Sequence, residues 1–139
     1  MEILKQLMRI KELDYEIDNL VERRKYYHDK ATKITTAYNE VGGGNGSYDS
    51  GKIEEYVTRM ADTLIEIEEK DKELECLRYD AEQQIDKVHN IEYKKLLKLK
   101  YLYYYSWKHI AKELNCSLDN VKGYMRSKAM EELEKNNTN

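Results

Sequence analysis

Apolar residues recur every three or four positions along two long stretches of the chain. The first stripe consists of Ile3, Leu7, Ile10, Leu13, Ile17, Leu20, Tyr27, Ala31, Ile34 and Tyr38, with one step of seven between Leu20 and Tyr27. The second consists of Ile53, Val57, Met60, Leu64, Ile67, Leu74, Ala81, Ile85 and Val88, with steps of seven where Asp71 and Arg78 interrupt it. Because this spacing places apolar side chains on one face of an α-helix, each stretch predicts a long helix with a coiled-coil seam.

A glycine-rich segment separates the two stripes. Five of the six glycines fall within residues 41–51, where a continuous helix would be costly in conformational entropy. The segment lacks a Gly-Lys-Ser/Thr ending and a preceding strand, so it does not match a phosphate-binding loop. We therefore predict a turn at residues 42–51 and an antiparallel helical hairpin over residues 1–89.

A two-helix hairpin buries only one seam, and neighbouring apolar residues such as Leu4, Met8, Tyr56 and Leu77 would stay partly exposed. The pattern therefore favours a homodimer that forms a four-helix bundle, with an elongated monomer as the alternative. The residues expected to mediate oligomerisation are Ile53, Val57, Met60, Leu64, Ile67 and Leu74.

The last third of the chain predicts three shorter helices. The first covers residues 90–104, and Ser106 and Ser117 can cap the two that follow by accepting bonds from free backbone N–H groups. Between those two, Ala111 allows a close helix crossing and Asn115 tolerates the left-handed conformation of a tight turn. Val121 would seal the joint. The fold class is therefore all-α, with a helix-turn-helix domain at residues 90–135 and a disordered tail at 136–139.

Charge is distributed unevenly along the chain. Residues 1–89 contain 14 Lys and Arg against 21 Asp and Glu, whereas residues 90–139 contain 10 against 6. Positive charge thus coincides with the helix-turn-helix, as attraction to nucleic-acid phosphates requires. The expected partner is double-stranded DNA, read in the major groove by the helix that starts near Ser117. The expected DNA-binding residues are Lys108, Lys112, Ser117, Leu118, Asp119, Lys122, Gly123 and Arg126.

These residues divide by expected role. Lys122 and Arg126 are the leading base or phosphate contacts, and Lys108 and Lys112 are expected to hold phosphates. Gly123 is unusual, because a mid-helix glycine costs about 1 kcal/mol relative to alanine. It indicates close approach of its backbone, either to DNA or to a packed neighbour. The tyrosines near residues 101–105 are expected to fill the small core rather than stack on bases.

Composition argues against a membrane protein, a secreted protein, a metal-binding protein and an enzyme. No window approaches the roughly 18 apolar residues of a membrane span, and no signal-peptide run opens the chain, so we expect a soluble cytoplasmic protein. The three histidines and two cysteines follow no metal-ligand or nucleophile-and-base spacing. We expect no metal, no cofactor and no enzymatic activity.

Two sequence segments carry a resemblance to known proteins. Residues 92–102 and 106–122 resemble the fourth region of bacterial sigma factors. The whole layout, including Ala31-Thr-Lys-Ile-Thr35, is similar to small phage and prophage proteins of Gram-positive bacteria. The resemblance implies transcriptional control of phage genes, as in the ArpU and RinA late-gene activators, with RNA polymerase as a possible partner.

The chain departs from that pattern at two places. Tyr103-Tyr-Tyr105 stands where related turns usually hold a glycine, and Lys128 stands where many related sequences have alanine, with Ala129 one residue later. The end of the second helix is therefore expected to pack in a shifted register. A different class of function also remains open, namely a DNA-packaging or protein-interaction adaptor such as a small terminase subunit. A ring of subunits, rather than a dimer, would indicate the adaptor.

Overall fold

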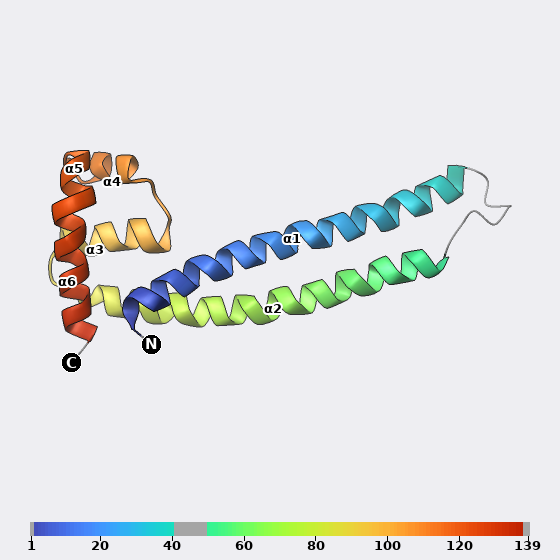
Figure 1. Cartoon of the computed structure of the whole chain (residues 1–139), viewed down its shortest axis with the longest axis horizontal. Helices are drawn as coiled ribbons and strands as arrows, with labels where there is room; N and C mark the ends of the chain where they lie inside the picture. Colours follow the sequence, from blue (N-terminus) through green and yellow to red (C-terminus); the bar gives the residue numbers. More distant parts are fainter. Residues whose placement is uncertain (1, 41–49, 138–139) are drawn as a thin grey trace. The chain divides into compact units, whose positions relative to one another are not determined.

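A computed structural model describes residues 2–40 and 50–137 of the chain, and these residues form helices and short connections without a β-strand. Helix α1 spans Ile3–Glu40 and helix α2 spans Ser50–Asp86 (Figure 1). The expected all-α class and the long helical hairpin are confirmed. Of the predicted turn at 42–51, residues 42–49 lie outside the described part, as does the side chain of Tyr38. Ser50 and Gly51 belong to α2, so the turn prediction is wrong for these two residues.

The chain packs as two compact units. One unit combines Met1–Glu12 with Leu74–Asn139, and the other consists of Leu13–Glu73. We call them the head unit and the outer hairpin. The head unit therefore includes the first turns of α1 and the last turns of α2 as well as the short helices. From the sequence we predicted a domain boundary after residue 89. In the structure, the first turns of α1 and the last turns of α2 instead pack with the short helices that follow residue 89.

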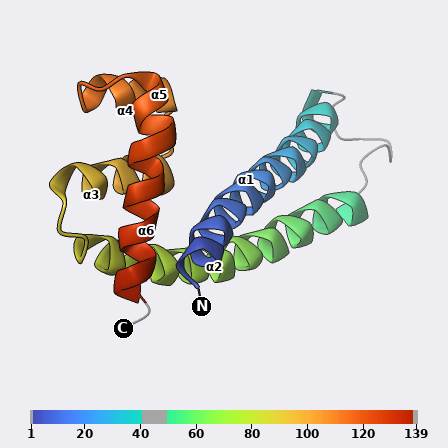
Figure 2. The same cartoon turned by 60° about the vertical axis from the view of Figure 1, so that its left-hand side comes forward.

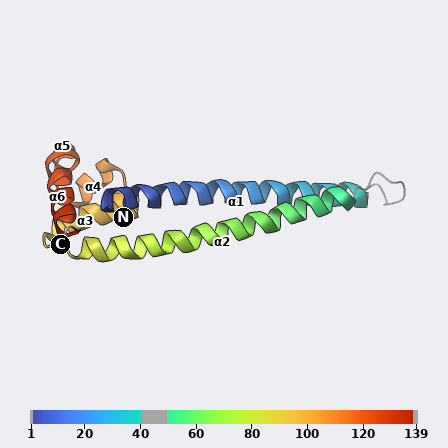
Figure 3. The same cartoon turned by 60° about the horizontal axis from the view of Figure 1, so that its bottom comes forward.

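Within the head unit, the first turns of α1 run antiparallel to the last turns of α2 (Figure 3). The buried side chain of Gln6 links them, because its Nε2 donates to the Leu77 carbonyl oxygen at 3.1 Å and to Asp80 Oδ2 at 2.8 Å. Gln84 Nε2 in turn donates to Gln6 Oε1 at 3.2 Å. A buried polar side chain is stable there because its amide atoms find partners.

The remaining helices of the head unit follow α2 in close succession. They are α3 (Ile91–Leu97), the π-helical segment η1 (Lys98–Leu102), α4 (Trp107–Glu113), α5 (Leu118–Asn120), the π-helical segment η2 (Val121–Met125) and α6 (Arg126–Asn137). Asn90 caps α3 by accepting a bond from the Tyr93 backbone N–H at 3.1 Å. The helix predicted for residues 90–104 thus begins as expected and ends at Leu102.

A single core holds these helices together. Its buried side chains are Ile85, Val88, Leu96, Leu97, Leu102, Ile110, Ala111, Val121, Met125, Ala129 and Leu133. Helices α4 and α5 lie at one end of α6, and the last turns of α2 lie near its other end (Figure 2). The apolar residues of α3, η1, α4, η2 and α6 therefore contribute to one shared interior.

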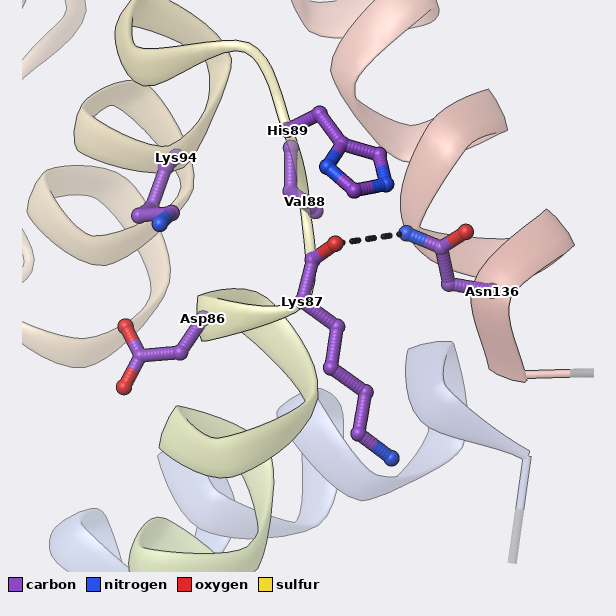
Figure 4. Close-up of a pocket in the computed structure, with 6 residues that line it drawn as sticks. All are labelled: Asp86, Lys87, Val88, His89, Lys94 and Asn136. Carbon is purple, nitrogen blue, oxygen red and sulfur yellow. Dashed lines mark hydrogen bonds between the residues drawn. The ribbon is translucent and has the colours of Figure 1, made fainter.

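The connection between α2 and α3 is fastened to the end of α6 (Figure 4). Asn136 Nδ2 donates to the Lys87 carbonyl oxygen at 3.1 Å, and the His89 backbone N–H donates to Glu132 Oε1 at 2.8 Å. Helix α6 continues to Asn137, so the tail predicted from residue 136 is wrong for its first two residues. Residues 138–139 of that tail lie outside the described part. Asn136 instead serves as a structural contact.

The outer hairpin is held by fewer buried side chains. Leu13, Leu20 and Thr63 are its buried residues within 13–34 and 51–73, the ranges where side chains are described. Lys70 Nζ pairs with Glu16 Oε2 at 3.0 Å, and the rings of Tyr27 and Tyr56 stack with centroids 6.2 Å apart. These contacts again pair α1 with α2 in antiparallel order.

The residues expected to mediate oligomerisation differ in exposure. Ile53, Met60 and Ile67 are half-buried, whereas Val57 and Leu64 are exposed at 51% and 41%. Leu74 lies in the head unit and is buried by the chain's own packing, which leaves little of it for a partner. Val57 and Leu64 are therefore the predicted residues that retain most apolar surface.

Candidate nucleic-acid interface

Helices α4 and α5 form the expected helix-turn-helix joint. Asn115 adopts the predicted left-handed backbone conformation, with φ of 55°, and the Cys116 backbone N–H donates to the Ala111 carbonyl oxygen at 3.0 Å. Ala111 is 7% exposed and Val121 is fully buried, as their assigned roles at the crossing require. The local sequence thus determines the turn through one residue that tolerates positive φ and one that permits close packing.

Serine side chains start both helices of the motif. Ser106 Oγ accepts a hydrogen bond from the His109 backbone N–H at 3.2 Å, and Ser117 Oγ accepts one from the Asn120 backbone N–H at 3.1 Å. Each serine satisfies a backbone donor that the first helical turn leaves unpaired. Both predicted caps are confirmed, and they define where α4 and α5 begin.

The residues assigned to DNA binding are all exposed. Lys108 and Lys112 lie on α4, Leu118 and Asp119 on α5, Lys122 and Gly123 on η2, and Arg126 at the start of α6, with Ser117 at the cap. Segments α5, η2 and α6 form one continuous helix over residues 118–137, which we call the C-terminal helix. Its buried face carries Val121, Met125, Ala129 and Leu133.

The C-terminal helix contains a π-helical turn at Val121–Met125. Here the Arg126 backbone N–H reaches back to the carbonyl oxygen of Val121. A π turn accommodates one additional residue in a helix, which shifts the register of everything after it. Ala129 is fully buried and Lys128 is exposed, in agreement with the one-residue shift expected from their order in the sequence.

A group of positive charges surrounds Lys100 on η1. Partial burial lowers the pKa of Lys100, and the nearby charges of Lys11, Arg126 and Lys122 lower it further. The positive charges of these residues repel one another, and an anion bound among them would offset this repulsion. We call Lys11, Lys100, Lys122 and Arg126 the basic cluster. It joins the start of α1, segment η1 and the C-terminal helix within the head unit.

Two members of the basic cluster were not identified from the sequence. Lys100 was counted only as part of the general positive charge, because its position on η1 gave no sign that it approaches Arg126. Lys11 lies in the acidic part of the chain, more than 80 residues before its neighbours in the cluster. No local pattern could have revealed it, since only tertiary packing brings the first turns of α1 into the head unit.

Aromatic side chains hold two members of the basic cluster. Lys100 Nζ lies 4.5 Å from the centroid of the Trp107 ring, a distance typical of a cation–π contact. Arg126 Nε donates to the hydroxyl oxygen of Tyr101 at 3.4 Å. Tyr101 and Trp107 thus support the charged ends of Lys100 and Arg126, a role that the sequence did not suggest.

The expectation that the tyrosines fill the core is wrong for Tyr103 and Tyr104, which are 54% and 43% exposed. Tyr105 is half-buried and stacks on His109, with ring centroids 4.4 Å apart. Tyr104 has a φ of 59°, in the left-handed region that normally favours glycine. Tyr104 therefore gives this turn a backbone conformation that glycine would adopt with less steric cost.

The hollow beside the α2–α3 connection is lined by Asp86, Lys87, Val88, His89, Lys94 and Asn136 (Figure 4). Its polar groups already serve the fold. Asp86 Oδ1 pairs with Lys98 Nζ at 2.6 Å, and this hydrogen bond raises the pKa of Lys98. Across residues 2–40 and 50–137, no three His, Cys, Asp or Glu side chains gather as metal ligands would. The basic cluster, in which Lys11, Lys122 and Arg126 are exposed, is therefore the stronger candidate for a binding site.

No match to this chain is found among protein-family models, curated proteins or solved structures. Over the described part of the chain, every helix is too short or too polar to cross a membrane.

Proposed function

We propose that this chain is a sequence-specific DNA-binding protein that regulates transcription. In this proposal, the C-terminal helix enters the major groove with the residues near its N-terminus. One observation carries the proposal: Lys122 and Arg126 are exposed on this helix, and their charges, with that of Lys11, lower the pKa of Lys100, a repulsion that a phosphate backbone would relieve. Such a role belongs in the compartment that holds the DNA, the cytoplasm of a bacterial host.

In this proposal, the two lysines of α4 contact phosphates while the C-terminal helix contacts bases. Lys108 and Lys112 are exposed on the first helix of the motif, which in helix-turn-helix proteins crosses the sugar-phosphate backbone. Phosphate contacts fix orientation without reading sequence, whereas side chains in the groove reach base edges. Arg126 can contact a guanine with two donors at once, and Tyr101 limits the directions in which its side chain points.

Binding to duplex DNA is the decisive experiment. A labelled pool of random duplexes, titrated with full-length protein at low salt, should give binding that weakens steeply as salt rises, because counterions are released on association. Selection from the same pool should enrich a preferred site. Well-folded protein that binds no duplex at low salt would rule out the proposal.

Two alanine variants test the assigned roles on the selected site and on random duplex. Lys108→Ala should weaken both by a similar factor. Arg126→Ala should cost roughly 1–3 kcal/mol on the selected site and much less on random DNA. Lys33→Ala removes an exposed lysine of the outer hairpin and serves as the charge-matched control, with affinity close to that of the unchanged protein. Equal losses from Arg126→Ala on both duplexes would make Arg126 a phosphate contact.

Self-association belongs to the same proposal. Exposed Val57 and Leu64 offer apolar surface on α2, and a homodimer through the outer hairpin would join two heads and read two half-sites. Particle mass in solution tests this step directly. A dimer supports the regulator, whereas eight or more subunits would favour a packaging adaptor that resembles a small terminase subunit. The resemblance to phage activators supports the regulator, with RNA polymerase as a further partner to test.

A further inference from the structure

Gly123 lies on the exposed face of the C-terminal helix. Its neighbours two residues away on either side, Val121 and Met125, are buried, so Gly123 faces the opposite direction. Lys122 and Tyr124 are exposed on its two flanks. Gly123 is therefore exposed to solvent in the described part of the chain.

Nothing in the described chain explains why this residue is glycine. A Cβ atom built on Gly123 would meet no described atom within 4 Å, and its backbone is not in the left-handed conformation that favours glycine. Close packing against another residue of the described chain therefore does not account for the glycine. Alanine would fit the space and stabilise the helix, because glycine is among the poorest helix formers. A second molecule that approaches this backbone closely would give glycine a role here.

The surrounding charges indicate the nature of that molecule. Lys122 precedes Gly123 directly, Arg126 follows three residues later, and both lie close enough to Lys100 to lower its pKa. A polyanion with a groove fits this arrangement. The major groove is about 12 Å wide, and a helix with its side chains is about 10–12 Å across, so little room remains at the groove floor.

We propose that Gly123 is the point of closest approach between the C-terminal helix and the base edges of bound DNA. This inference rests on the proposed DNA-binding function. The missing side chain lets the helix backbone reach the groove floor, which brings Lys122 and Arg126 within range of the bases on that side. The π turn that contains Gly123 supports this role, since π turns within helices occur often at functional sites.

The test uses full-length Gly123→Ala and Gly123→Leu, which add increasing bulk at a position where the fold has space. Gly123→Ala should raise the melting temperature by a few degrees, because alanine favours the helix. The same change should weaken binding to the selected duplex about tenfold, and Gly123→Leu should weaken it further. Ser127→Ala, one turn later on the exposed surface, improves helix propensity without adding bulk and should keep its affinity within about twofold.

The outcomes separate this inference from the function beneath it. If the unchanged protein binds DNA and Arg126→Ala weakens it, yet both Gly123 variants bind normally, the close approach at Gly123 is wrong and the DNA-binding proposal stands. Equal losses from Gly123→Ala and Ser127→Ala would attribute the effect to helix stiffening and also overturn the inference. A change in particle mass without loss of DNA affinity would assign Gly123 to a protein contact instead.

Discussion

The head unit and the outer hairpin share the same helical periodicity but bury their side chains to different degrees. In the head unit, Leu97, Ile110 and Leu133 are fully buried, because helices cover them from several directions. In the outer hairpin, seam residues such as Ile53 and Met60 stay half-buried, and Leu64 remains exposed. An apolar stripe therefore predicts a helix reliably, whereas the depth of burial depends on how many other helices pack against that stripe.

The difference also suggests how each region gains stability. The head unit closes its core with residues from both ends of the chain, as in an ordinary globular domain. Two helices alone leave apolar surface on each side, and a second copy of the chain could cover it. We therefore expect the outer hairpin, rather than the head unit, to mediate any self-association of the chain.

The largest expected effect compares two buried leucines. Leu97→Ala should lower the free energy of unfolding of the head unit by about 3–5 kcal/mol, because its cavity is enclosed by packed helices. Leu20→Ala in the outer hairpin should cost less, about 1–2 kcal/mol, because its surroundings can collapse or admit water. Urea titrations followed by circular dichroism measure both. Equal costs would remove the distinction between the two regions.

The second prediction concerns assembly. Leu64→Asp should convert a dimer to a monomer while the helices persist, since the new charge would lie in the intersubunit seam yet remain hydrated in the monomer. Light scattering coupled to size-exclusion chromatography gives the mass. Thr58→Asp adds the same charge at an exposed polar position of α2 outside the predicted seam, and it should remain dimeric. A monomeric unchanged protein, or a dimeric Leu64→Asp variant, would refute assembly through Leu64.

The smallest effect tests the turns within the head unit. Tyr104→Gly should raise the free energy of unfolding by about 1 kcal/mol, because glycine adopts a positive φ without the steric cost that tyrosine meets. Tyr103 has a φ of −109°, so Tyr103→Gly should bring no such gain and serves as the control. Thermal unfolding of the two variants shows the contrast. Similar shifts for both would indicate that side-chain contacts, rather than backbone strain, dominate this turn.

Local features of the sequence predicted much of the motif. Asn115 marked the left-handed turn, Ser106 and Ser117 marked the helix starts, and the buried positions Ala111 and Val121 followed from spacing. Each of these signals depends on residues only a few positions apart. The exposure of the assigned DNA-binding residues also agrees with their expected face, although DNA binding itself stays a prediction.

Features that depend on contacts between residues far apart in the chain were not predicted from the sequence. Lys11 joins the basic cluster only because the first turns of α1 pack within the head unit. Asn136 belongs to a helix rather than a tail because its amide reaches the Lys87 carbonyl, 49 positions earlier. The predicted burial of the tyrosines was wrong for another reason. Ring size suggests burial, but a short turn such as that of Tyr103 and Tyr104 has no interior in which to place them.

The contact between Lys100 and Trp107 has an optical consequence. Trp107 is the chain's one tryptophan, and an ammonium group lies 4.5 Å from the centre of its ring. Indole emission responds to nearby charge, so a phosphate that draws Lys100 away from the ring would change the colour and intensity of the intrinsic fluorescence. If phosphate binds at the basic cluster, the fluorescence of Trp107 would report that binding without an added label.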